Sequence, residues 1–165
     1  MRLLKDKYPN IKAIFAGSGP LEEDIKHQIK ENGLENKIHL LGWRDDVKEL
    51  INSCDMVTLL SKREGLGKCL LEAMRCGKPV VATNTRGPRE LVEENGNGFL
   101  VKIDDIDETA NTIEKLYVAN NRSQQLEEQI NEKANKYLLD NVLNQLNSIY
   151  DELEIEESKL LGVRI

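Results

Sequence analysis

The chain has 165 residues and few aromatic ones, so it is long enough for one domain with a mainly aliphatic core that needs no metal or disulfide for stability. Its net charge of −6 argues against a nucleic-acid partner, because such partners bind basic surfaces and the basic residues here are scattered among acidic ones. Three cysteines without a CxxC pair, and no secretory signal or membrane-spanning run, lead us to expect a cytoplasmic protein with reduced thiols.

Short apolar runs alternate with helical patterns over residues 1–105. Each run has four to six residues, and such runs between turn residues are typical of strands in a parallel sheet. In chain order, strands are predicted at residues 11–16, 37–41, 56–60, 79–83 and 98–101. Helices are predicted after the first four of them, at residues 20–32, 45–51, 66–75 and 88–93.

The last part of the chain, residues 106–165, is polar, amphipathic and helical. Helices are predicted at residues 109–119, 123–139 and 141–153. The last of these places a set of apolar side chains on one face: Val142, Leu146, Ile149, Tyr150 and Leu153. We interpret residues 1–165 as a single domain, in which this helical segment is appended to the α/β units.

The alternation of strands and helices predicts an α/β fold, in which helices cover both faces of a Rossmann-like parallel sheet. In such sheets, ligands bind beyond the carboxyl ends of the strands. Three predicted loops leave that edge, at residues 17–20, 42–46 and 61–67. We therefore expect a small-molecule site where these loops converge.

Two glutamates accompany the third loop. Glu64 stands in the loop before a helix, and Glu72 stands on that helix. Gly65 and Gly67 let a ligand approach the backbone closely, and the helix start offers unpaired N–H groups suited to phosphate. Carboxylates accept several hydroxyl donors, so the arrangement fits a sugar that carries phosphate. Another pair of glutamates eight residues apart lies elsewhere in the chain, so the setting and not the spacing carries this hypothesis.

Residues 61–83 read S-x-x-E-G-L-G-x-x-L-L-E-A-M-x-x-G-x-P-V-V-A-T, with G-x-G-P before them and T-x-G-x-x-E-L-V after them. This pattern resembles the C-terminal half of retaining glycosyltransferases with the GT-B fold, family 4 of the glycosyltransferases, in the branch that makes bacterial capsular and exopolysaccharides. The resemblance covers residues 9–116. It implies transfer of a hexose from a nucleotide sugar, with UDP as the expected nucleotide, to a glycan or lipid-linked acceptor. It also implies that no metal or other cofactor is needed, and a place in the cytoplasm at the inner face of the cell membrane.

The resemblance also implies roles for individual residues. Glu64 would be the catalytic residue and would hold hydroxyls of the transferred sugar, and Glu72 would hold the ribose hydroxyls. Gly87 would face the cleft between two domains. The predicted donor-binding residues besides Glu72 are Gly17, Gly19, Trp43, Arg44, Gly65, Leu66, Gly67, Lys68 and Gly87.

Parts of the family pattern are absent from residues 1–165. The pattern begins one strand and one helix earlier, with an Arg and a Lys that clamp the pyrophosphate, and it includes an N-terminal acceptor-binding domain. We therefore expect a donor-binding half without useful transferase activity of its own. Three explanations fit this expectation: a fragment, a split gene product, and a subunit that docks onto an acceptor-binding chain. A missing edge strand and helix also predict an uncovered apolar sheet surface, with self-association or poor solubility.

Two other functions stay open from the sequence. One is a non-catalytic binding subunit that supplies the donor site to another chain, and the other is a different sugar-nucleotide enzyme, such as an epimerase. Individual residues have alternatives too. Trp43 fits a hydrophobic cap on the sheet edge as well as a contact with the base, and Lys68 fits a surface charge as well as a phosphate contact.

Overall fold

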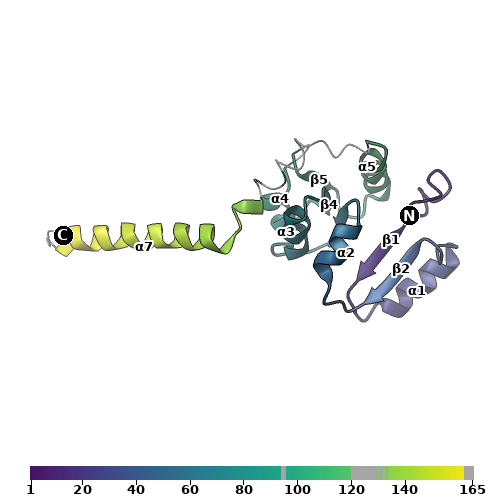
Figure 1. Cartoon of the computed structure of the whole chain (residues 1–165), viewed down its shortest axis with the longest axis horizontal. Coiled ribbons are helices and arrows are strands. Elements are labelled where there is room, and N and C mark those ends of the chain that lie inside the picture. The colour runs from purple at the N-terminus through teal and green to yellow at the C-terminus, as the bar shows by residue number, and fades with distance from the viewer. Residues whose placement is uncertain (94–95, 120–129, 131, 133, 162–165) are drawn as a thin grey trace.

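The computed structural model describes the chain except for residues 94–95, 120–129, 131, 133 and 162–165 (Figure 1). The strands are β1 (Ala13–Ala16), β2 (Ile38–Gly42), β3 (Val57–Leu59), β4 (Val80–Thr83) and β5 (Gly98–Val101). The helices are α1 (Glu22–Glu31), α2 (Val47–Ser53), α3 (Lys68–Arg75), α4 (Arg86–Leu91), α5 (Ile106–Ala119) and α7 (Leu139–Leu161). The predicted strands are present, and the α/β class is confirmed. The helix predicted at residues 123–139 lies largely outside the described residues.

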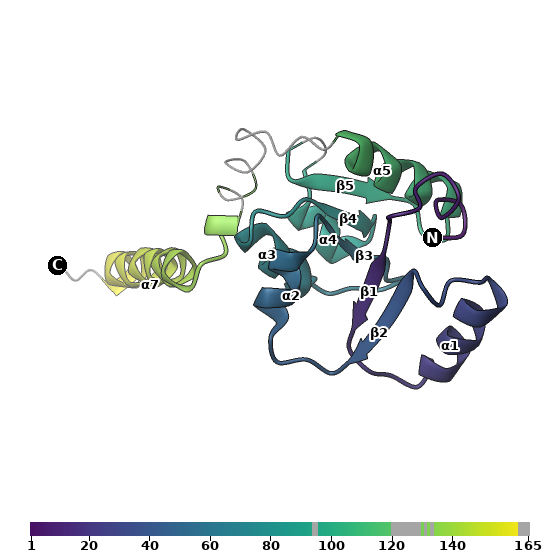
Figure 2. The same cartoon turned by 45° about the vertical axis from the view of Figure 1, so that its right-hand side comes forward.

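The strands form two parallel sheets, whereas the sequence pattern predicted one. β1 pairs with β2, so that Ala13 lies opposite Ile38. The second sheet has the order β3-β4-β5, and Val80 of its central strand lies opposite Val57 and Gly98. In Figure 2, β5 runs across the view while β1 and β2 run down it. No hydrogen-bonded strand pairing joins the two sheets among the described residues.

β1 and β3 each have an unpaired edge. In the described part of the chain, β1 pairs only with β2 and β3 only with β4, and both views place β1 between β2 and the three-stranded sheet (Figures 1 and 2). We expected an outer edge strand to be lacking, but these free edges lie between the sheets. The uncovered apolar surface is present, because Ile14 of β1 is 36% exposed and Phe15 is 49% exposed.

The main hydrophobic core surrounds the three-stranded sheet. All of β4 is buried, α3 packs Leu70 and Met74 into this core, and α4 adds Leu91. Full burial of one such side chain contributes about 1.5–3 kcal/mol relative to exposure. This packing fixes the carboxyl ends of β3 and β4, from which the loops to α3 and α4 leave.

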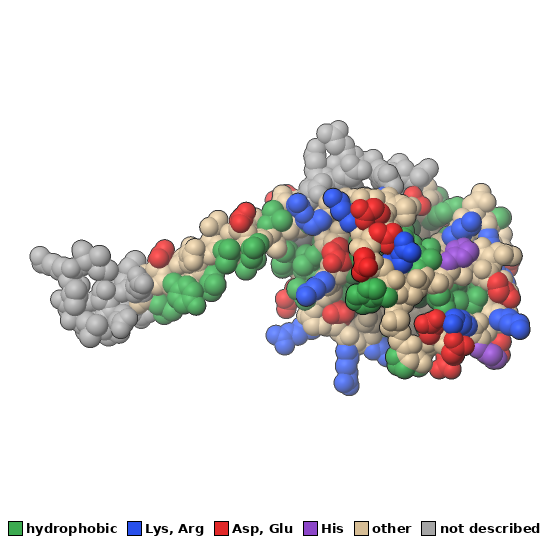
Figure 3. Space-filling model, turned by 60° about the horizontal axis from the view of Figure 1, so that its bottom comes forward, with side chains coloured by type: hydrophobic (Ala, Val, Ile, Leu, Met, Phe, Trp, Pro, Cys, Tyr) green, Lys and Arg blue, Asp and Glu red, His purple; other side chains and the backbone are tan. Residues whose placement is uncertain are grey.

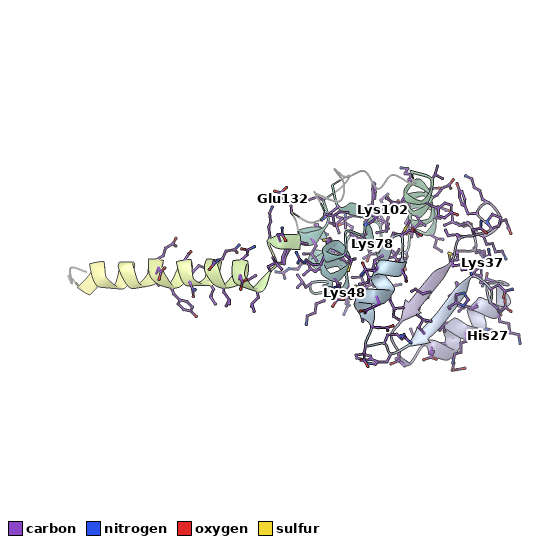
Figure 4. All side chains as sticks on the ribbon, viewed as in Figure 1. His27, Lys37, Lys48, Lys78, Lys102 and Glu132 are labelled. Carbon is purple, nitrogen blue, oxygen red and sulfur yellow. The ribbon has the colours of Figure 1, made fainter. Side chains whose placement is uncertain are left out.

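A hydrogen bond from a buried lysine connects α2 to the same sheet. Lys78 precedes β4, and its ammonium group donates a hydrogen bond to the carbonyl oxygen of Asn52 at 2.8 Å (Figure 4). Such a partner is required, because an unpaired buried charge is costly. His27, by contrast, lies exposed on α1 beside Glu31 at 3.3 Å.

The start of the chain packs against α5. Leu4 and Ile11 form a small apolar cluster with Ala110. The Tyr8 hydroxyl donates to the Glu114 carboxylate at 2.7 Å, and Lys7 pairs with the same carboxylate. The segment that leads into β1 is therefore attached to the helix that covers the three-stranded sheet.

The last helix, α7, extends away from the rest of the protein (Figure 1). Figure 3 shows apolar side chains gathered along one side of it. The side chains predicted to share a face are between 42% and 58% exposed: Val142, Leu146, Ile149, Tyr150 and Leu153. Self-association, which was predicted from the uncovered sheet surface, stays a prediction. Within the described residues, no helix is long and apolar enough to cross a membrane.

Candidate functional site

Residues 60–67 connect β3 to α3 and are called the Glu64 loop below. Gly67, its last residue, has a φ of +83° in the left-handed region. A Cβ atom on Gly67 would lie 3.1 Å from the side chains of Leu59 and Leu70. Both the backbone conformation and the available space therefore require glycine where the loop turns into the helix.

The Glu64 carboxylate binds the backbone of its own loop. Its Oε1 atom accepts hydrogen bonds from the N–H groups of Gly65 at 3.0 Å and Gly67 at 3.2 Å. The carboxylate thus lies at the N-terminal end of α3, where the helix dipole stabilises an anion. The sequence predicted these amides as ligand contacts, but here Glu64 occupies them. Its Oε2 atom makes no hydrogen bond with any described residue, so this oxygen can accept a hydroxyl from a ligand.

Glu72 lies on the exposed face of α3, about 6 Å further along the helix axis than Lys68. The pKa of the Cys69 thiol is influenced by the charges of both glutamates. Burial raises the pKa of its thiol, and the carboxylates of Glu72 and Glu64 raise it further. Both carboxylates therefore act on one sulfur atom, which places them around the first turns of α3.

The segment after β4 holds the Glu64 loop from another side. The Thr83 hydroxyl donates a hydrogen bond to the carbonyl oxygen of Ser61. The N–H of Gly87 points to the carbonyl oxygen of Glu64 at 3.4 Å, and a Cβ on Gly87 would lie 2.4 Å from the carbonyl oxygen of Gly65. Gly87 is buried against this loop, and its predicted place at a cleft between two domains stays a prediction.

Positive side chains surround the loop. Arg63, Lys68 and Arg86 are exposed, and none of them forms an ion pair with a described residue. Lys62 differs, since it pairs with Asp104 at 2.7 Å, although such exposed pairs contribute little stability. The three unpaired cations are available to an anionic ligand.

The predicted glycines, Gly17 and Gly19, lie in the loop that follows β1 of the two-stranded sheet. Gly17 has a φ of +131°, and its N–H donates to the carbonyl oxygen of Gly42 at 2.7 Å, which joins the loops after β1 and β2. Gly19 is exposed in the same loop. No hydrogen bond or ion pair between described residues connects these two loops to the Glu64 loop.

Trp43 and Arg44 also lie in the loop after β2. Trp43 is 79% exposed, and its indole N–H donates to Asp45 at 3.1 Å. Arg44 pairs with Asp46 at 2.5 Å, and this hydrogen-bonded guanidinium lowers the pKa of the Asp46 carboxyl. The structure thus gathers Gly65, Leu66, Gly67, Lys68, Glu72 and Gly87 around Glu64, and leaves Gly17, Gly19, Trp43 and Arg44 on the β1–β2 sheet.

The candidate site is an open surface. Glu72, Gly65 and Lys68 are exposed, and Leu66 is 37% exposed. Two hollows, of about 520 and 450 Å³, lie along β5 and α5 and in the loop between them. Neither is lined by Glu64 or Glu72.

Sequence reasoning assigned no role to two threonines of this region. Thr83 holds the Glu64 loop, as described above. Thr85 is only 8% exposed, and its hydroxyl has no partner among the described residues. The signal was present in the run A-T-N-T-R-G, because polar residues at the carboxyl end of a buried parallel strand are well placed for a ligand.

The family model described as "Glycosyl transferases group 1" matches residues 1–137. The chain belongs to the group 1 glycosyl transferases. The match includes both glutamates, the Glu64 loop and the segment after β4. The GT-B resemblance inferred from the sequence is therefore confirmed.

Individual group 1 relatives agree with this. The chain is 39% identical over 115 residues to a Bacillus subtilis (strain 168) protein named as glycosyltransferase EpsD, covering 70% of this chain and 30% of that protein. It is 31% identical over 109 residues to the UDP-Gal:alpha-D-GlcNAc-diphosphoundecaprenol alpha-1,3-galactosyltransferase of Escherichia coli, covering 66% and 28%. The solved structure of Anabaena Alr3699/HepE in complex with UDP has a TM-score of 0.76 and 33% identity, covering 88% and 41%. The chain thus spans well under half of each of these proteins.

Proposed function

We propose that this chain binds the nucleotide-sugar donor, a UDP-sugar, of a retaining glycosyltransferase in surface-polysaccharide biosynthesis. The observation that carries the proposal is the Glu64 carboxylate, which two amides hold at the start of α3 while its Oε2 atom stays free, with Glu72 on the same helix. Two relatives support the choice of nucleotide. HepE was solved with UDP, and the E. coli relative is named for a UDP-Gal donor and a diphosphoundecaprenol-linked acceptor.

In this proposal each carboxylate has its own task. Glu64 is the catalytic residue, whose Oε2 atom accepts hydrogen bonds from hydroxyls of the transferred sugar, whereas Glu72 accepts them from the ribose hydroxyls. The backbone of Gly65, Leu66 and Gly67 lies beside the sugar and phosphate. Glu72 is well placed for a second group of the same ligand, because it follows the loop on the same rigid helix.

The chemical step breaks the bond between the anomeric carbon and the pyrophosphate oxygen. The acceptor oxygen forms the new bond on the same face of the sugar, and its proton passes to the departing phosphate. We assign the stabilisation of that phosphate to Arg63, Lys68 and Arg86, which are exposed in or beside the Glu64 loop, since preorganised charge is often the largest catalytic contribution. We propose that these cations act without a metal ion.

The base and the acceptor lie beyond the Glu64 loop in this proposal. Gly17, Gly19, Trp43 and Arg44 serve the base side of the donor if the loops of the β1–β2 sheet reach the same ligand. Because the chain spans under half of its relatives, we propose that a further domain or chain binds the glycan or lipid-linked acceptor at the inner face of the cell membrane. The isolated chain is then expected to bind donor without turnover.

Titration of UDP, GDP, ADP and UDP-glucose against the chain by calorimetry and NMR tests the proposal. We expect UDP to bind, and we expect Glu72→Ala to weaken UDP binding at least tenfold by removing the acceptor for the ribose hydroxyls. Glu35→Ala is the matched control, because Glu35 is an exposed glutamate in the loop before β2. Absence of binding by all four nucleotides at millimolar concentration, or equal effects of the two variants, would refute the proposal.

A further inference from the structure

The strongest additional feature of the site is the contact between α4 and the Glu64 loop. A Cβ atom on Gly87 would lie 2.4 Å from the carbonyl oxygen of Gly65, 2.6 Å from its carbonyl carbon and 2.7 Å from the nitrogen of Leu66. Real side chains do not approach a backbone so closely. Any other residue at position 87 must therefore displace the peptide group that joins Gly65 to Leu66.

That peptide group lies between the two amides that hold the Glu64 carboxylate. The amide of Gly65 precedes it and the amide of Gly67 follows it, and both donate to the same Oε1 atom. A shift of the intervening peptide therefore changes the direction of both donors. The orientation of the Oε2 atom, which the proposed function assigns to the sugar hydroxyls, changes with them.

Two further contacts connect the loop to the end of β4. The N–H of Gly87 points to the carbonyl oxygen of Glu64 at 3.4 Å, and the buried Thr83 hydroxyl binds the carbonyl oxygen of Ser61. The Glu64 loop is thus held near its start by Thr83 and at its centre by Gly87.

We propose that Gly87 is a positioning residue, which sets the Gly65–Leu66 peptide and through it the direction of the Glu64 carboxylate toward the sugar. This inference rests on the proposed donor function. It differs from a direct donor contact, because Gly87 acts on the ligand only through Glu64. Because Gly87 has a φ outside the left-handed region, the lack of space for a Cβ, and not the backbone conformation, favours glycine at this position.

Gly98 supplies a matched control. A Cβ on Gly98 would lie 2.3 Å from the carbonyl oxygen of Val80, so alanine meets backbone at this position as well. Gly98 and Val80 are opposite each other at the amino ends of β5 and β4, away from the Glu64 loop. Gly98→Ala therefore measures what a buried steric clash does to stability without a change at the site.

The test compares Gly87→Ala, Gly98→Ala and the unaltered chain by thermal unfolding and by titration with UDP and UDP-glucose. Both variants are expected to lower Tm. Only Gly87→Ala is expected to reduce the preference for UDP-glucose over UDP, by about tenfold, because the ribose acceptor Glu72 is not disturbed. In a Glu64→Gln background, Gly87→Ala should no longer alter this preference, since coupled residues are non-additive.

Ligand-free NMR keeps the test independent of the donor's identity. Gly87→Ala should shift the amide resonances of Gly65 and Gly67, and Gly98→Ala should not. Thr83→Val, which removes a hydroxyl with little change of shape, should shift them less and serves if Gly87→Ala does not fold. Unchanged amide resonances in both Gly87→Ala and Thr83→Val, or equal loss of UDP and UDP-glucose binding, would overturn the inference. Failure of the unaltered chain to bind any nucleotide would instead refute the proposed function.

Discussion

The two sheets of this protein are built from equally apolar strands, yet they differ in what covers them. In the three-stranded sheet, β4 is buried along its whole length beneath α3 and α4. In the two-stranded sheet, three of the four residues of β1 are exposed. Apolar strands of parallel sheets are normally covered on both faces. β1 therefore has a sequence typical of a buried strand, although most of its residues are exposed. The difference shows that hydrophobic sequence specifies a strand but does not by itself supply its neighbours.

The largest expected effect is a difference in the free energy of unfolding between substitutions in the two sheets. Met74→Ala creates a cavity in the core of the three-stranded sheet, so it should lower the free energy of unfolding by about 2–5 kcal/mol. Phe15→Ala in β1 removes a half-exposed ring and should cost about 1 kcal/mol or less. Urea unfolding of both variants measures the difference. Equal losses would mean that β1 is as well packed in solution as β4.

An intermediate effect compares two glycines with similar backbone conformations. Gly42 has a φ of +64° and open space around it, whereas Gly67, at +83°, has two leucine side chains 3.1 Å from an added Cβ. Gly42→Ala should cost about 1–2 kcal/mol from backbone strain alone. Gly67→Ala should cost about 1 kcal/mol more from overpacking. Chemical denaturation tests the order, and a larger loss at Gly42 would contradict the comparison.

The smallest effect concerns the attachment of the first segment to α5. Hydrogen bonds from Lys7 and Tyr8 lower the pKa of Glu114 below its usual 4.5. Ionised Glu114 therefore adds stability above the unfolded-state pKa, and this contribution is lost as the pH falls through the lower folded-state pKa. Glu114→Gln should reduce stability slightly at neutral pH, and the difference should disappear at a pH below the folded-state pKa of Glu114. An NMR titration that gives Glu114 an ordinary or raised pKa would contradict the assigned contacts.

Local patterns in the sequence predicted the elements of this fold well. The run at residues 79–83 became β4 (Val80–Thr83), and the run at 98–101 became β5 (Gly98–Val101). The short helix predicted from Pro88 begins two residues earlier, at Arg86. The reason is that proline is tolerated in the first turn of a helix, where its missing N–H has no intrahelical partner.

What could not be predicted depends on contacts between distant residues or on a choice between partners. The division into two sheets is a matter of strand pairing, and no local pattern reports the neighbour of β1. The sequence placed Glu64 beside the amides of Gly65 and Gly67, but periodicity does not reveal that the carboxylate takes those amides for itself. The closeness of Gly87 to Gly65 joins positions 22 residues apart in the sequence, so only the folded chain displays it.

The hydrogen bonds between the Glu64 carboxylate and the amides of its own loop affect how a ligand approaches the site. Its negative charge already neutralises the positive end of α3, so an incoming pyrophosphate meets less long-range attraction from that helix than an uncapped end would exert. The rate of encounter then depends on the exposed cations Arg63, Lys68 and Arg86, whose influence is screened by salt. Donor capture should accordingly slow as ionic strength rises, while the lifetime of the bound state, governed by the short hydroxyl contacts, changes little.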